Sequence, residues 1–103
     1  MNRLVAVHAP AAWLGEVLVI SVELWTDTVF VHIATDRPGD AVWLNRIPLS
    51  LADDAGTTYE PRESSAGGTG TELRGMWRFE PGVPVGAVRV TVTLGDDSLE
   101  LTL

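Results

Sequence analysis

The sequence contains no cysteine and no lysine. Without cysteine the chain has neither a disulfide framework nor a thiolate metal site, so noncovalent packing must hold its fold together. Seven arginines stand against 14 acidic residues, which gives a net charge of −7. Binding to nucleic acid normally needs a basic stripe that faces the phosphates. This composition therefore argues against nucleic acid as a partner.

Long apolar runs are also missing. The first 20 residues contain one arginine followed by apolar residues, but His8, Pro10 and Glu16 interrupt them. A membrane span needs about 20 predominantly apolar residues in a row, so no span is expected. The same segment does not read as an export signal, which favours the cytoplasm. We interpret its apolar residues 4–7 as part of a strand.

The chain is long enough for one domain and too short for two. Of its 103 residues, 46% are hydrophobic, which is sufficient to close a core. No change in composition marks a domain boundary, and no internal repeat is present. We therefore expect a single domain over residues 1–103.

Residues 17–34 carry the clearest pattern, an alternation of apolar and other side chains that indicates an antiparallel hairpin. With a turn at Thr26 and Asp27, the alternation predicts three apolar pairs on the core face: Leu24 with Val29, Val22 with Val31, and Ile20 with Ile33. The opposite face then carries a mixed set of side chains that includes Val19, Trp25, Phe30 and His32.

The remaining segments also suggest strands separated by turns. Short apolar or alternating runs occupy residues 3–8, 41–44, 47–51, 71–80, 88–94 and 99–103. Loops or turns are predicted at residues 9–15, at the Pro38–Gly39 dipeptide, at residues 53–56 and at residues 95–98. Residues 61–70 are rich in glycine and serine and lack periodicity, so they are predicted to form the longest and most mobile loop.

No segment shows helical spacing of its apolar residues, and turn signals recur roughly every 8 to 12 residues. Within 71–80, Leu73, Trp77 and Phe79 share one parity and are predicted to enter the core. The sequence thus predicts an all-β fold, an antiparallel two-sheet immunoglobulin-like sandwich of seven to eight strands.

Two short motifs stand out between residues 17 and 94. One is a D-D-x-G-T-x-Y segment with Asp53, Asp54, Gly56, Thr57 and Tyr59, and the other is an F-x-P-x-x-P element with Phe79, Pro81 and Pro84. With these motifs, three stretches of the chain resemble bacterial immunoglobulin-like β-sandwich domains, sometimes called telokin-like. The resemblance implies a fold and no activity. Many such domains are secreted or membrane-tethered, whereas this chain shows neither signal nor anchor.

The hairpin face with Trp25, Phe30, His32 and Val19 is the candidate contact surface, because aromatic rings offer large contact area at low entropy cost. A protein partner or a second copy of the chain is the expected occupant. The alternative is a carbohydrate-binding module that stacks sugar rings on Trp13, Trp25 or Trp43. Trp77 and Trp43 are otherwise expected in the core, and Trp13 over an open end of a sheet.

The acidic turns and the two histidines are the residues that could hold a metal ion. Asp53 and Asp54 are weak calcium candidates, since that cation needs six to eight oxygen ligands, and a calcium-stabilised extracellular module is a further alternative. Adjacent aspartates beside glycine, as at Asp96 and Asp97, are also ordinary turn residues. His8 and His32 lack zinc-site spacing.

No nucleophile elbow, phosphate loop or zinc-protease motif occurs in the sequence. We therefore expect no metal, no cofactor and no catalysis, and the hypothesis is a non-enzymatic interaction module.

Overall fold

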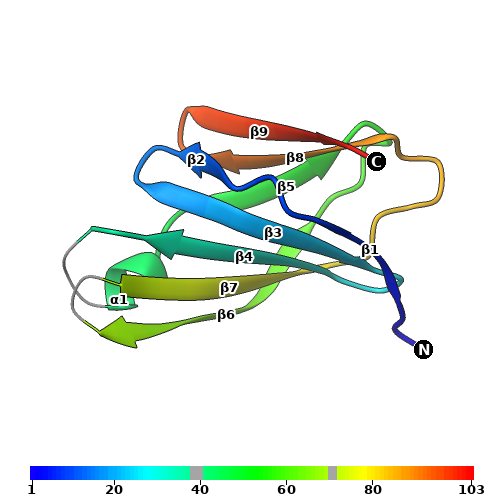
Figure 1. The fold of residues 1–103 in the computed structure, drawn as a ribbon. Helices are drawn as coiled ribbons and strands as arrows, with labels where there is room; N and C mark the ends of the chain where they lie inside the picture. Colours follow the sequence, from blue (N-terminus) through cyan, green and yellow to red (C-terminus); the bar gives the residue numbers. More distant parts are fainter. Residues whose placement is uncertain (38–40, 70–71) are drawn as a thin grey trace.

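The computed structural model describes residues 1–37, 41–69 and 72–103. Within them the chain forms two antiparallel sheets, and Figure 1 shows the sheets stacked with the larger one below. The larger sheet has the order β1-β3-β4-β7-β6, with β2 also paired to β3, and the smaller has the order β5-β8-β9. The strands of the two sheets are β1 (Leu4–His8), β2 (Ala12–Leu14), β3 (Val17–Trp25), β4 (Val29–Thr35), β5 (Leu49–Asp53), β6 (Glu60–Thr69), β7 (Glu72–Glu80), β8 (Arg89–Leu94) and β9 (Asp97–Thr102).

The prediction of an all-β chain in two antiparallel sheets is confirmed, although the described residues hold nine strands rather than seven or eight. A short helix, α1 (Ala41–Leu44), joins β4 to β5, where the sequence had predicted a strand. No helix in the described part of the chain is long and apolar enough to cross a membrane.

The central hairpin forms from β3 and β4, but only two of the three predicted pairs are correct. Leu24 pairs with Val29 and Val22 with Val31, as expected. A β-bulge then shifts the register, so that Val19 pairs with Ile33 and Ile20 does not. The run VLVI at 17–20 is apolar throughout, and a slip of one residue there buries no polar side chain. Parity alone could therefore not locate the bulge.

One apolar core lies between the two sheets. Every second residue of β4 is buried, and the core-facing residues of β7 and β8 pack against them. The fully buried side chains include Val17, Val19, Val22, Val29, Val31, Ile33, Leu44, Leu73, Phe79, Val90 and Val92. Trp77 is half-buried and packs against this cluster. The predicted core parity of β7 is confirmed.

The prediction of a long loop over 61–70 is wrong for the described residues. Residues 61–69 belong to β6, which pairs with β7 along its whole length. Serine and glycine offer little side chain to bury, so no alternation marks this strand in the sequence. Backbone pairing with β7 supplies its order instead. Residue 70 lies outside the described residues.

Other connections follow the predictions more closely. The turn after β5 and the hairpin β8–β9 occur where expected, while β2 interrupts the loop predicted at 9–15. Val88, the first residue of the strand predicted over 88–94, lies just before β8 and is exposed. The turn predicted at Pro38–Gly39 lies outside the described residues.

Candidate functional site

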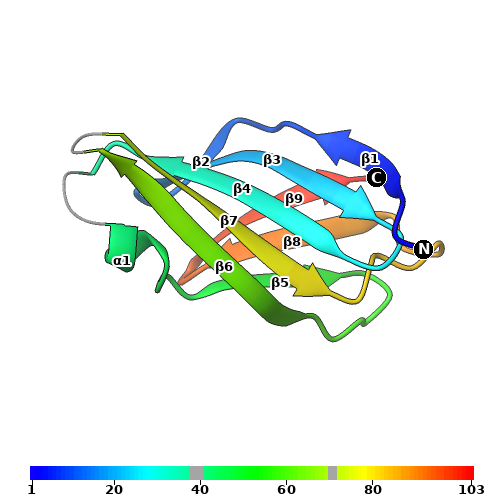
Figure 2. The same cartoon turned by 90° about the horizontal axis from the view of Figure 1, so that it is seen from below.

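The outer face of the larger sheet is uncovered in the described part of the chain (Figure 2). The smaller sheet packs on the opposite face, and Figure 2 shows β3, β4, β7 and β6 in front with no other described element over them. Most side chains on this face are half-buried, and they are covered only by their neighbours in the sheet. Because no described element lies over the face, another molecule can reach it.

Trp25, Phe30 and His32 lie together on this face near the β3–β4 turn. Trp25 ends β3, and its ring meets the edge of the Phe30 ring at 6.2 Å between centroids and 72° between planes. The Glu23 carboxylate joins the group, because its Oε1 accepts a hydrogen bond from Trp25 Nε1 at 3.1 Å. Its Oε2 lies 2.9 Å from His32 Nε2. These contacts hold the aromatic rings in one arrangement.

Apolar side chains from the sheet edge extend this cluster. Leu4 and Val7 on β1 are 51% and 54% exposed. Leu4 pairs with Trp25 and Val7 with Glu23, so they share the outer face. Trp13 on β2 is also exposed but pairs with Leu18, at the opposite end of β3 from Trp25. We name Leu4, Val7, Trp25 and Phe30 the outer-face patch. Exposed apolar clusters of this kind usually mark an interface.

Val19 does not belong to this surface, contrary to the sequence prediction. The bulge in β3 turns Val19 toward the smaller sheet, where it is fully buried. Glu23 lies on the face instead, between Trp25 and His32. Its parity with Trp25 was a signal for that position, but a glutamate on an outer face suggested only solvation.

A groove of about 1100 Å³ opens at one end of the two sheets and has Trp25 in its wall. The connection between β7 and β8 lines much of the groove. Gly82 in this connection packs closely against the backbone of the β3–β4 turn. A Cβ at Gly82 would overlap the carbonyl oxygen of Thr26 and lie 2.7 Å from that of Trp25. The glycine in the sequence PGVP is therefore required for this close approach.

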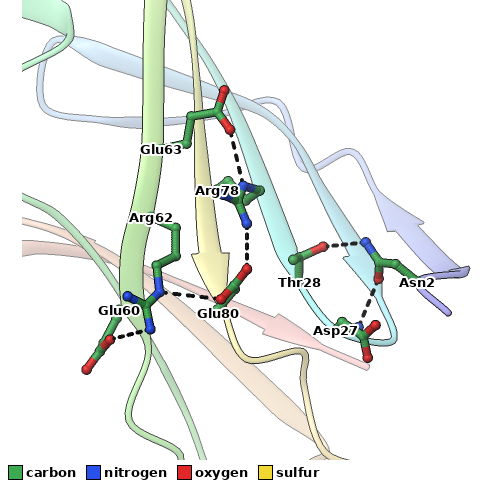
Figure 3. A network of polar contacts seen from close by, with 8 residues as sticks. All are labelled: Asn2, Asp27, Thr28, Glu60, Arg62, Glu63, Arg78 and Glu80. Carbon is green, nitrogen blue, oxygen red and sulfur yellow. Dashed lines mark hydrogen bonds and ion pairs between the residues drawn. The ribbon is translucent and has the colours of Figure 1, made fainter.

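An alternating series of charges lies beside the groove, across β6 and β7 (Figure 3). Arg78 bonds Glu63 through Nε at 3.3 Å and Glu80 through Nη1 at 2.6 Å. Arg62 lies 3.4 Å from Glu80 and 2.8 Å from Glu60. Five charged side chains thus neutralise one another in sequence, and they carry little net charge toward a ligand.

Asp53 and Asp54, the weak calcium candidates, direct their oxygens at hydrogen-bond donors of the chain. Asp53 Oδ1 accepts from the amides of Ala55 at 2.8 Å and Thr57 at 3.1 Å, and Oδ2 accepts from the Tyr59 hydroxyl at 2.6 Å. Asp54 Oδ1 accepts from the Val88 amide at 2.9 Å. Their geometry is that of a closed turn, which accounts for both aspartates without a cation.

The remaining candidates are scattered over the molecule. His8 pairs with Val22 and lies on the core side, whereas His32 lies on the outer face, so the sheet separates the two histidines. No group of three potential metal ligands occurs among the described residues. Trp43 packs against the core, with the Arg37 guanidinium 4.1 Å from its ring centroid. Asp96 and Asp97 lie at the β8–β9 turn.

No protein-family model matches the sequence, and no curated protein or solved structure is significantly similar to the chain.

Proposed function

We propose that this chain is a non-enzymatic interaction module that binds another protein through the outer-face patch. The observation that carries the proposal is the uncovered sheet face on which Trp25 and Phe30 stand beside exposed Leu4 and Val7. Burying such side chains against a partner removes apolar surface from water, at about 25 cal/mol per Å². The network through Glu23 preorganises the rings and so lowers the entropy lost on binding.

The arrangement supports a protein partner better than a sugar. A stacking platform for carbohydrate needs aromatic planes that lie flat and in line, whereas Trp25 and Phe30 meet edge to face at 72°. Trp43 is packed against the core and beneath Arg37. Trp13 alone would offer one ring. A mixed apolar and polar face with an aromatic pair fits the composition of protein interfaces.

We also propose that the sandwich is of the immunoglobulin-like type. If β4 is left out, the strand orders of the two sheets are β1-β3-β7-β6 and β5-β8-β9. These orders match the ABED and CFG sheets of constant-type immunoglobulin domains. In this chain β4 lies between β3 and β7 and is antiparallel to both, so β3 and β7 run parallel. The connectivity therefore supports a variant with one added strand, and the added strand departs from the immunoglobulin pattern.

A photo-crosslinking phenylalanine analogue at position 30 tests the function in the cells that make this protein. We expect one discrete adduct whose mass exceeds the 11.1 kDa chain by that of a different protein. The same analogue at Thr91, on the outward side of β8, is the matched control and should give no such band. Absence of an adduct at position 30, or equal adducts at both positions, would contradict the proposal.

A further inference from the structure

The two sheets have four open edges, and three of them are protected against pairing with another chain. The edge formed by β1 and β2 is interrupted at Pro10 and Ala11, where Ala11 has a φ of 48°. The edge strand β5 has five residues and follows Pro48. The edge strand β9 carries Asp97 and Glu100. Short length, interruption and charge are the usual means by which proteins protect strand edges.

The fourth edge, β6, is long, and proline, a bulge and charge protect only its first half, while α1 contacts β6 and β7. It spans ten residues and pairs with β7 alone. Its beginning is protected against pairing with another strand by Pro61, by the bulge at Arg62 and by the charge of Glu63. Residues 64–68 are two serines, an alanine and two glycines, with no charge and no proline. Their backbone makes no hydrogen bond to a described residue outside the β6–β7 pair.

We propose that β6 pairs antiparallel with β6 of a second copy of this chain, about a twofold axis at Ser65. The inference rests on the proposed interaction function and specifies how that module self-associates. Such an axis must stand perpendicular to the sheet, because only that rotation reverses the strand while it keeps the free edges together. Opposed residues then lie on the same face, so their numbers must have an even sum.

Charge and chain geometry select Ser65 among the possible axis positions. With the axis at Ser65, residues 63–67 pair with each other, and Pro61 and the bulge stay outside the paired stretch. Glu63 of one copy then lies beside Gly67 of the other, whose neighbour on β7 is Arg74. Gly67 has open space where a Cβ would be. The carboxylate, which pairs with Arg78 of its own chain in the monomer, can therefore turn toward Arg74 of the other copy across the glycine, once on each side of the axis.

An axis at a neighbouring residue loses these features. At Ser64 the paired stretch would include Pro61, which has no amide hydrogen to donate. At Ala66 Glu63 would oppose residue 69 and move away from Gly67. A perpendicular axis also places both outer faces on the same side of the joined sheet. The dimer would present two outer-face patches to one partner, which raises its apparent affinity without any new contact.

Sedimentation of the full-length chain at 0.15 M salt, over a range of about 5 to 500 μM, tests this pairing. We expect a reversible dimer. Ser65→Glu and Ser65→Lys each place like charges opposite one another at the axis, and each should weaken dimerisation at least about tenfold. An equimolar mixture of the two variants should restore the dimer as a heterodimer, because its opposed charges attract.

The matched controls are Ser50→Glu and Ser50→Lys, which put the same charges at an exposed position on the β5 edge. They should dimerise like the unchanged chain. Unchanged dimerisation of the Ser65 variants, a mixture that stays monomeric, or a monomeric parent chain at 500 μM would each overturn the proposal. These results do not depend on the Phe30 crosslink, which reports separately on the interaction function. A crosslinked adduct of two copies at position 30 would also contradict pairing through β6.

Discussion

At the scale of single residues, the segment from Asp53 to Tyr59 shows how a recognisable motif can serve structure alone. Burial by itself would raise the pKa of the Asp53 carboxyl, but the hydrogen bonds from Tyr59 and Thr57 and the backbone amides of Thr57 and Ala55 outweigh it and hold the pKa below 3.8. Burial and the adjacent carboxylate raise the pKa of Tyr59. The phenol therefore remains a hydrogen-bond donor throughout the usual pH range.

This lowered pKa predicts a loss of stability in acid. In the folded chain Asp53 binds its proton only below the pH at which the unfolded chain does. Its contribution to the free energy of unfolding is therefore complete above about pH 4 and disappears as the pH falls through the lowered value. Tyr59→Phe should reduce the free energy of unfolding at pH 7 by about 1 to 2 kcal/mol, since it removes a hydrogen bond to a charged group.

Urea unfolding from pH 7 to pH 2 measures both effects. The variant should show a shallower decline below pH 4 than the unchanged chain. Thr58→Ala, at an exposed neighbouring position, should change the free energy of unfolding by less than about 0.5 kcal/mol. An equally steep decline in Tyr59→Phe would show that this hydrogen bond does not hold the Asp53 pKa down.

At the scale of elements, α1 and β6 exist because of what they contact. A four-residue helix has no stability of its own in water. Leu44 is fully buried and anchors α1 in the core, near Gly75 of β7. β6 likewise depends on backbone pairing with β7, and its side chains add little. Neither element has a local sequence pattern that marks its type.

The dependence of α1 on one side chain gives a second prediction. Leu44→Ala should lower the free energy of unfolding by about 2 to 5 kcal/mol, because it leaves a cavity in the core. Val42→Ala in the same helix is the control, since Val42 is 52% exposed, and its effect should stay below about 0.5 kcal/mol. Chemical denaturation followed by circular dichroism measures both variants. Similar losses in the two would contradict the assignment of Leu44 as the anchor.

At the scale of the whole molecule, the two sheets share one core and should unfold together. The described aromatic residues lie outside the smaller sheet, on or beside the larger sheet and on α1. Tryptophan fluorescence therefore reports on the larger sheet, while a substitution in β8 perturbs the smaller. Val92 is fully buried between them. These positions allow a test of whether the sheets are coupled.

Val92→Ala should lower the free energy of unfolding by roughly 2 to 3 kcal/mol, from lost apolar burial and a partly retained cavity. The midpoints seen by fluorescence and by circular dichroism should shift equally, as for a two-state transition. Thr91→Ala, on the opposite side of β8, should shift neither by more than about 0.5 kcal/mol. A fluorescence midpoint that stays in place while circular dichroism shifts would show independent sheets.

The sequence alone determined the fold class, the central hairpin and the core side of β4 and β7. Alternation along a strand is a local property, because successive side chains point to opposite faces wherever one face is buried. The sequence also brought Trp25, Phe30 and His32 onto one face, since they share a parity around one turn.

Only the tertiary structure decided the register beyond Val22, the strand at β6, the helix α1 and the absence of any described element over the outer face. Each depends on a partner distant in the chain. An apolar run such as VLVI accepts a bulge without burying a polar group, so the contacts of Val19 with the core select the register. Small residues such as those of 64–68 take the conformation that β7 imposes on them. The sequence of a segment does not show which distant residues it will contact. Those contacts form only when the chain folds, and they decide the conformation of these segments.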